Sequence, residues 1–279
     1  MDKPIVAILY DFDKTLAVTD MQNFKFIPAM GLSPEEFWST TTKFCEKAGI
    51  DKILGYMYMM IKIAKENNIK LTRDFLNKQG KGIKYYRGVE NWFKRIKEYA
   101  QTKGIIVEHY LITSGNKEIV EACSIAEEFK AIFGCEYVYN EEGEAIWPKQ
   151  MVNYTQKTQY IFRIAKGLLQ GNDDVKINEK QSTKRVQLQN MIYLGDGLTD
   201  VPSMIVIKEN GGTSIAVYKN NEKEKVIPLF VNNRVNFICK ADYGENSELD
   251  KVVKLIIDNI SVKTSLEKRI NDIRKELEQ

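Results

Sequence analysis

The chain has 279 residues, of which 43% are hydrophobic and 28% are charged, a balance typical of a folded globular protein. Its formal net charge is +3, which is too small to indicate nucleic-acid binding, because that function needs a clustered basic surface. We therefore expect one large domain, or a domain with a sizeable insert, and no nucleic-acid partner.

The four cysteines are widely spaced and form no CxxC pair (Cys45, Cys123, Cys135 and Cys239). This spacing indicates free, buried thiols in a reducing compartment. No apolar run reaches the roughly 18 residues of a membrane span. The apolar run near the N-terminus is short and ends at Asp11, unlike that of a signal peptide. The sequence thus predicts a cytoplasmic protein with no membrane partner.

The first strong signal is the run IVAILY, residues 5–10, which predicts a buried strand that ends directly before Asp11 and Asp13. Two carboxylates this close would normally cause one of them to keep a proton, so their pairing indicates a divalent cation. Mg²⁺ is the cation expected here, because it prefers hard oxygen ligands and is held by one or two carboxylates together with substrate phosphate.

Residues 17–86 interrupt the strand pattern with helical patterns. Ser33 and Glu36 form a capping-box signature, with a proline at the first helical position between them. Asp51 and Thr72 are candidate N-caps of two further helices. Because no convincing strand signal occurs in this region, we expect a helical insert between the first and second units of the sheet.

Later in the chain, short apolar runs alternate with helical patterns, which predicts a parallel α/β sheet covered on both faces. The expected strands lie at 105–112, 191–194, 214–218 and 237–239, a hairpin is expected over 134–148, and a loop over 170–189. In parallel sheets, sites lie at the carboxyl ends of the strands. Asp196 and Asp200, in the sequence GDGLTD, are therefore expected to meet Asp11 and Asp13.

The side-chain chemistry favours phosphoryl transfer. One carboxylate can attack phosphorus to form an aspartyl-phosphate, while its neighbour protonates the leaving alkoxide and then activates water. The sequence contains neither G-x-S-x-G nor GxxxxGK[ST], which would indicate a serine hydrolase or a P-loop enzyme. His109 is the only histidine and lies in an apolar strand, so we expect a core histidine and no zinc site.

The transferred phosphoryl group also needs hydrogen-bond donors and a positive charge. Thr113 ends the second expected strand and is the first candidate donor to the phosphoryl group, with Ser114 beside it as the alternative. Lys157, near the start of an expected helix over 155–168, is the best-placed cation. Lys149 and Lys166 lie nearby in the sequence and remain alternatives.

These residues together resemble the haloacid-dehalogenase-like (HAD) superfamily of phosphohydrolases. DFDKTL, residues 11–16, resembles its DxDx(T/V) first motif, LIT ending at Thr113 its second, Lys157 its third, and GDGLTD, residues 195–200, its fourth. The resemblance implies a Rossmann-like three-layer α/β core with a parallel sheet, formed by residues 1–16 and 87–279. It also implies that residues 17–86 form a helical type 1 cap.

The resemblance further implies a role for each motif residue. Asp11 becomes the nucleophile and Asp13 the general acid/base, while Thr113 and Lys157 hold the phosphate. Asp196 becomes a metal ligand, Asp200 a ligand or a support for one, and Asp13 offers its main-chain carbonyl to Mg²⁺; Asp11 completes this metal set. An acid at position 13 favours phosphatases over dehalogenases.

Two further residues are candidate substrate contacts. Asp20 lies nine residues after Asp11, where phosphoserine-phosphatase-like members carry a glutamate, so the resemblance extends to that branch with a shorter acid. Arg87 stands at the expected hinge between cap and core, where it could meet a substrate carboxylate or phosphate, although a surface arginine is the default. The run from Tyr56 to Met60 is expected to pack in the cap core, with pocket lining as its alternative.

The sequence therefore predicts a Mg²⁺-dependent phosphatase acting on a small phosphomonoester. A phosphomutase or phosphotransferase using the same aspartate is the first alternative, and a non-enzymatic phospho-acceptor module is the second. The insert at 17–86 and the acid Asp13 argue against the second. The oligomeric state stays open: the C-terminal stripe of Leu266, Ile270, Ile273 and Leu277 is expected to pack on its own domain, with a dimer contact as the minority interpretation.

Overall fold

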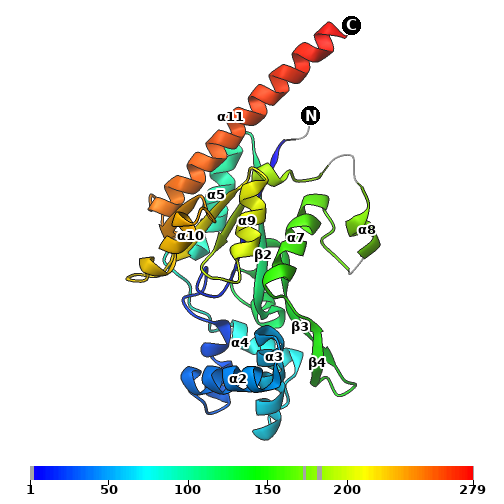
Figure 1. The fold of residues 1–279 in the computed structure, drawn as a ribbon, viewed down its shortest axis with the longest axis vertical. Helices are drawn as coiled ribbons and strands as arrows, with labels where there is room; N and C mark the ends of the chain where they lie inside the picture. The colour runs from blue at the N-terminus through cyan, green and yellow to red at the C-terminus, as the bar shows by residue number, and fades with distance from the viewer. Residues whose placement is uncertain (1–2, 172–173, 181–183, 279) are drawn as a thin grey trace.

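A computed structural model describes residues 3–171, 174–180 and 184–278 (Figure 1). Its centre is a seven-stranded sheet with the strand order β4-β3-β2-β1-β5-β6-β7. All neighbouring strands are parallel except β3 and β4. The strands are β1 (Ile5–Tyr10), β2 (Ile106–Asn116), β3 (Phe129–Tyr139), β4 (Ala145–Gln150), β5 (Met191–Gly195), β6 (Thr213–Tyr218) and β7 (Phe237–Lys240).

Helices cover the sheet in two layers, because the β1–β2 and β5–β6 connections run toward opposite edges of the sheet and right-handed crossovers then place their helices on opposite faces. On one side, α5 (Val89–Thr102) packs on β2 and against α11 (Glu248–Leu277). On the other, α7 (Tyr154–Lys166) and α9 (Val201–Glu209) pack against each other. The shorter helices of the sheet region are α6 (Lys117–Glu121), α8 (Asp174–Asn178), α10 (Ile227–Val231) and the 3-10 turns Ala126–Glu128, Leu188–Asn190 and Lys223–Lys225. A further 3-10 turn, Met21–Asn23, lies in the insert after β1. The predicted three-layer α/β fold is confirmed.

Four helices gather below the sheet in Figure 1, in the region between β1 and α5. They are α1 (Phe26–Ala29), α2 (Pro34–Ala48), α3 (Lys52–Glu66) and α4 (Arg73–Gly80). The expected caps form: Ser33 and Glu36 complete the capping box of α2, Asp51 accepts two backbone N–H groups of α3, and Thr72 accepts one of α4. The β3–β4 hairpin reaches this layer, where the Ala145 N–H donates to the Leu71 carbonyl at 2.8 Å.

The hairpin itself was predicted, but the first half of β3 was not. Residues 129–133 pair with β2 in parallel before the strand continues into the hairpin. The expected loop over 170–189 contains the short helix α8 and the turn Leu188–Asn190, while positions 172–173 and 181–183 of that prediction lie outside the described residues.

The core predictions hold at several positions. All four cysteines are free and buried. His109 is buried in β2, where its Nδ1 lies 2.9 Å from the Tyr10 hydroxyl and its Nε2 lies 3.3 Å from the Phe93 carbonyl oxygen. Burial and the nearby Lys97 lower the pKa of His109 to about 3, so the ring is neutral at physiological pH. Among the described residues, no helix is both long and apolar enough to cross a bilayer.

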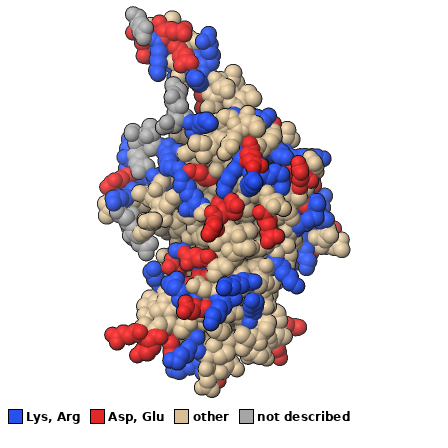
Figure 2. Space-filling view, turned by 180° about the vertical axis from the view of Figure 1, so that it is seen from behind, with Lys and Arg blue, Asp and Glu red and all other residues tan. Residues whose placement is uncertain are grey.

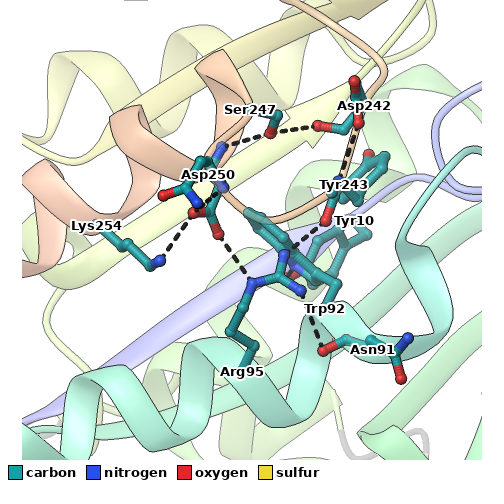
Figure 3. A network of polar contacts seen from close by, with 11 residues as sticks. Tyr10, Asn91, Trp92, Arg95, Asp242, Tyr243, Ser247, Asp250 and Lys254 are labelled. Carbon is teal, nitrogen blue, oxygen red and sulfur yellow. Dashed lines mark hydrogen bonds and ion pairs between the residues drawn. The ribbon is translucent and has the colours of Figure 1, made fainter.

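The start of α11 is fixed to the core by a polar network (Figure 3). Asp250 accepts from Arg95 at 3.1 Å and from Lys254 at 2.8 Å, and Arg95 also donates to the Tyr243 carbonyl at 2.6 Å. Ser247 caps the helix by accepting from the Asp250 N–H. This half of α11 is also held by apolar packing, since Leu249, Val253 and Ile257 are buried (these three residues lie on the face toward the core).

The other half of α11 corrects a prediction. The stripe of Leu266, Ile270, Ile273 and Leu277 does not pack on its own domain, because these side chains are between 42% and 82% exposed. In Figure 1 the red end of the helix projects away from the body. The sequence pattern identified residues that share a face of the helix but could not tell that the body of the protein stops short of them.

Candidate active site

The turn after β1 carries the two acids of the first motif. The Asp11 N–H donates to the Leu194 carbonyl of β5 at 2.9 Å, which fixes Asp11 at the carboxyl edge of the sheet. Lys14 adopts a left-handed backbone conformation with φ of +59°, which turns the chain sharply. The Asp13 carboxylate accepts from the Met21 N–H at 2.7 Å. Both acids are thereby held in one short turn.

Lys157 connects the first and fourth motifs. Its Nζ lies 2.7 Å from an Asp11 carboxylate oxygen and 2.7 Å from an Asp200 carboxylate oxygen, and its side chain is fully buried. It projects from the first turn of α7, which begins after a capping box formed by Asn153 and Gln156. Lys157 is 146 positions from Asp11 and 43 positions from Asp200 in the sequence, so its ammonium joins three distant segments of the chain.

The alternative lysines lie elsewhere. Lys149 forms an ion pair with Glu136 at 3.3 Å on the β3–β4 hairpin. Lys166, at the far end of α7, donates to the backbone carbonyl of Glu179 at 2.7 Å. Of the three candidates, only Lys157 contacts Asp11.

Asp196 completes a cluster of carboxylates. One oxygen from each of Asp11, Asp196 and Asp200 lies within 4.8 Å of the others. Burial, together with Asp11 and Asp200, raises the pKa of Asp196 well above its usual range. Burial also raises the pKa of Asp11 to about 6, against the pull of Lys157. Among the described residues, one ammonium, that of Lys157, contacts this all-oxygen cluster. The donor set and the excess of negative charge therefore fit a hard divalent cation such as Mg²⁺.

Asp200 is held by a residue that the sequence reasoning missed. The Tyr193 hydroxyl donates to the Asp200 carboxylate at 2.7 Å, and the Gly197 N–H donates to its other oxygen at 3.3 Å. Tyr193 lies in β5, two residues before the GDGLTD motif begins. An apolar strand pattern treats such a tyrosine as a core residue, so no signal marked its hydroxyl as part of the site.

The end of β2 contributes the candidate phosphate holders. Thr113 is fully buried and its Oγ accepts from the Gly115 N–H at 3.0 Å. The Ser114 Oγ is buried and has no hydrogen-bond partner within the described part of the chain. A Cβ on Gly115 would lie 2.1 Å from the end of the Met21 side chain and 3.1 Å from the Asp13 carboxylate, so a larger residue here would displace Met21. The two motif turns are therefore packed directly against each other.

A cleft of about 430 Å³ opens between these strand ends and the helices α2 and α3. Its sheet side includes Asp11, Asp13 and Asp196, and its helical side includes Trp38 and Tyr56. The Tyr56 hydroxyl donates to the Ser114 carbonyl at 2.7 Å, which ties α3 to the phosphate-site turn. The run from Tyr56 to Met60 thus divides. Tyr56 lines the cleft, as the alternative interpretation had it, and Met57, Met59 and Met60 are buried in the core as expected. Tyr58 is exposed, so the expected core packing is wrong at that position.

The two candidate substrate contacts differ in position. Asp20 lines the cleft, where both of its carboxylate oxygens lie within 2.9 Å of the Lys14 ammonium. Arg87 does not line the cleft. Its side chain is 69% exposed and pairs with Asp242 at 2.7 Å, so the structure does not bring Arg87 together with the other candidates and gives it the default role of a surface arginine.

Comparison with known proteins identifies the fold. No family model matches the chain. A protein of Borreliella burgdorferi strain B31, described only as uncharacterized, is 24% identical over 274 residues, covering 88% of this chain and 94% of that one. The fold is similar to that of a HAD family hydrolase from Salmonella enterica serovar Typhi, with a TM-score of 0.59, 16% identity, and coverage of 91% of this chain and 71% of that one.

Two phosphoserine phosphatase structures are similar as well. The apo form gives a TM-score of 0.55 at 17% identity, covering 89% of this chain and 98% of that one. A structure described as a phospho-aspartyl intermediate analogue gives 0.54 at 17% identity, covering 91% and 99%. At these identities the similarity establishes the fold, and the predicted resemblance to the HAD fold is confirmed.

Proposed function

We propose that this chain is a Mg²⁺-dependent phosphatase that hydrolyses a small phosphomonoester through an aspartyl-phosphate on Asp11. The observation that carries the proposal is the contact of Lys157 with both Asp11 and Asp200, at 2.7 Å each, beside Asp196 at the floor of a cleft. Three of the four sequence motifs thereby converge on one point. Phosphatases are among the solved structures that share the fold, which supports the same reaction class.

In this proposal, Asp11 and Asp13 divide the chemistry. A carboxylate oxygen of Asp11 forms a bond to phosphorus while the ester oxygen leaves and takes a proton from Asp13. Burial, Asp20 and Asp11 raise the pKa of Asp13 well above its usual range, so Asp13 is suited to hold that proton at neutral pH. In the second step, water gives its proton to Asp13 and its oxygen bonds to phosphorus, which releases Asp11 and inorganic phosphate.

The remaining residues hold the phosphoryl group. Lys157 supplies a positive charge that is already desolvated and fixed by two carboxylates, so it needs little reorganisation during the reaction. The unpartnered Ser114 Oγ supplies a further donor. The Thr113 Oγ accepts from the Gly115 N–H, which orders the turn and leaves the Thr113 O–H free to donate to the phosphoryl group.

The acidic cluster defines where the metal would bind. Asp11, Asp196 and Asp200 would offer carboxylate oxygens, and Asp13 would offer its main-chain carbonyl. When bound, Mg²⁺ supplies positive charge that neutralises the phosphate oxygens and keeps Asp11 ionised at neutral pH. Asp200 reaches this cluster while also accepting from Lys157 and Tyr193, so it both supports the lysine and completes the acidic set.

We also propose that the chain divides into a core of residues 1–16 and 87–279 and a cap of residues 17–86. The cleft lies between these two parts, and Trp38, Tyr56 and Lys52 line it from the cap side. A cap in this place would exclude bulk water during transfer and open for release. The cleft volume of about 430 Å³ favours a small phosphorylated metabolite as substrate.

The test is release of inorganic phosphate from a panel of amino-acid, sugar, nucleotide and vitamin monophosphates, with Mg²⁺ and after chelation. We expect turnover of at least one ester that requires the metal. Asp11→Asn should reduce it roughly 10,000-fold or more, whereas the matched control Asp272→Asn on α11 should not. Activity that survives in Asp11→Asn would refute the nucleophile. Transfer to a second hydroxyl without phosphate release would instead indicate a phosphotransferase.

A further inference from the structure

The C-terminal half of α11 leaves the body of the protein as a free-standing helix (Figure 1). Its last side-chain contacts with the body are those of Ser261, which donates to the Lys103 carbonyl at 2.9 Å, and Lys263, which donates to Gln189 at 2.7 Å. From residue 261 to residue 278, no side chain is buried. The network of Figure 3 fixes the other end of the helix, so the free half is presented in a defined direction.

This free half carries an apolar stripe that nothing in the described chain covers. Leu266, Ile270, Ile273 and Leu277 follow one another at spacings of four, three and four residues. At 100° per residue these four side chains lie on one face of the helix. They are 61%, 49%, 42% and 82% exposed, respectively. An ordered helix that exposes such a stripe to water is incomplete without a partner surface.

Charged side chains flank the stripe in a self-complementary order. Glu267 and Arg274 lie along one side, and Arg269 and Glu276 along the other. All four are exposed, and none has an ion-pair partner within the part of the chain that the structure describes. Figure 2 shows acidic and basic side chains side by side on this projecting end. We propose that the occupant of the stripe is the same helix of a second copy of this chain, packed antiparallel about a two-fold axis.

The charges select one register for this antiparallel pair. When Ile270 faces the partner's Ile273, Leu266 faces the partner's Leu277, and all eight apolar side chains are covered. In this register Glu267 lies beside the partner's Arg274, and Arg269 lies beside the partner's Glu276. Each pairing occurs twice by symmetry, which gives four complementary contacts along the two edges of the interface.

Other arrangements place like charges together. A shift by one heptad toward the body sets Glu267 against the partner's Glu267 and Arg269 against the partner's Arg269. A shift the other way sets Arg274 against the partner's Arg274. A parallel pair brings Arg269 to the partner's Arg274, since these positions flank a parallel seam. The antiparallel register described above is the one in which every flanking charge meets its opposite.

The pair should be weak, because the stripe spans only two heptads. We expect sedimentation velocity to show a monomer–dimer equilibrium over micromolar to millimolar concentrations. Arg269→Glu with Arg274→Glu makes every flanking residue acidic, and Glu267→Arg with Glu276→Arg makes every one basic. Each double variant should be monomeric alone, and an equimolar mixture should form a heterodimer. Lys268→Glu with Lys275→Glu, on the outer face, changes the net charge as much as the first variant and should dimerise as wild type.

Each result bears on the proposal. Helical content measured by circular dichroism shows whether a variant keeps its helix, and none of these positions belongs to the proposed catalytic machinery. Wild-type protein that stays monomeric up to millimolar concentration would overturn the proposal. So would charge variants that dimerise alone as wild type does, or a mixture that stays monomeric, because the flanking charges would then not form the interface.

Discussion

The buried carboxylates at the base of α11 and at the strand ends have pKa values shifted in opposite directions. At the base of α11, Asp250 faces two cations, Arg95 and Lys254, and a backbone N–H from Asn246 (Figure 3). Burial acts to raise the pKa of Asp250, but Lys254, Asn246 and Arg95 outweigh it and lower the pKa below its usual range. That carboxylate is therefore stable as an anion in the folded protein.

At the carboxyl ends of β1 and β5 the balance is reversed. Asp11 and Asp200 share the contact of one lysine, Asp196 lies beside them, and the pKa values of Asp11 and Asp196 are raised. A cluster that only stabilised the fold would be matched with cations as Asp250 is. The difference supports the proposal that the acids at the strand ends bind a further positive charge and take part in chemistry, at a cost in stability.

After Asp11→Asn, the largest effect should come from Asp13, which lies at the strand ends and takes no part in the Asp250 network. In Asp13→Asn the turnover number should fall roughly 100- to 10,000-fold, because the amide cannot exchange a proton with the leaving group or with water. The fold should be unchanged, since an amide oxygen can still accept from the Met21 N–H. Unaltered turnover in this variant, measured as phosphate release on the best ester of the panel, would remove Asp13 from the mechanism.

The next prediction concerns the stability that Asp250 provides through its ion pairs with Arg95 and Lys254. Asp250→Asn should lower the free energy of unfolding by about 2 kcal/mol, because Arg95 and Lys254 lose their shared anion. The loss should show as a lower urea midpoint with an unchanged slope. Turnover per folded molecule should stay as in wild type. A variant as stable as wild type would mean that the network of Figure 3 does not hold α11 to the core.

An aspartate-to-asparagine substitution in the candidate active site should change the free energy of unfolding in the opposite direction. In metal-free protein at neutral pH, Asp196→Asn should raise the free energy of unfolding by about 1 kcal/mol, because it removes a buried charge whose pKa is raised. Thermal unfolding in a chelator measures the gain. The rise in melting temperature that Mg²⁺ gives the wild type should shrink in the variant. Destabilisation of the metal-free variant would show that Asp196 is satisfied without a cation.

Much of the site was accessible to sequence reasoning because its signals are local. Asp11 and Asp13 follow a continuous apolar run, and Asp196 follows another. Each apolar run predicts a strand, and the acids after it are therefore predicted to lie at the end of that strand. The structure brings them together as a parallel sheet requires. Lys157 was weaker as a prediction, since Lys149 and Lys166 offered the same charge nearby and only the fold selects among them.

What was missed depends on contacts between distant segments. The first half of β3 reads FKAIF, an unremarkable stretch after two acids, and only pairing with β2 makes it a strand. The hydroxyl of Tyr193 acquires its role from Asp200. Arg87 pairs with Asp242, 155 residues later in the chain, and therefore lies outside the cleft. The stripe on α11 shows the same limit, because periodicity identifies a shared face and leaves its partner undefined.

The smallest predicted effect uses the one histidine as a control for the acids. His109 has its pKa lowered to about 3 by burial and by Lys97, while in the unfolded chain it titrates near 6.5. Between these values the unfolded chain binds a proton that the folded protein does not, so this residue makes stability fall as the pH falls. Asp11, with its pKa raised to about 6, acts in the opposite direction.

We therefore compare wild type with His109→Gln by urea unfolding. From pH 7 to pH 6 the free energy of unfolding of the wild type should fall by about 0.7 kcal/mol more than that of the variant. An equal change in both proteins would mean that His109 binds its proton in the folded state, and the strand β2 would then tolerate a charge that its packing against Tyr10 and Phe93 should exclude.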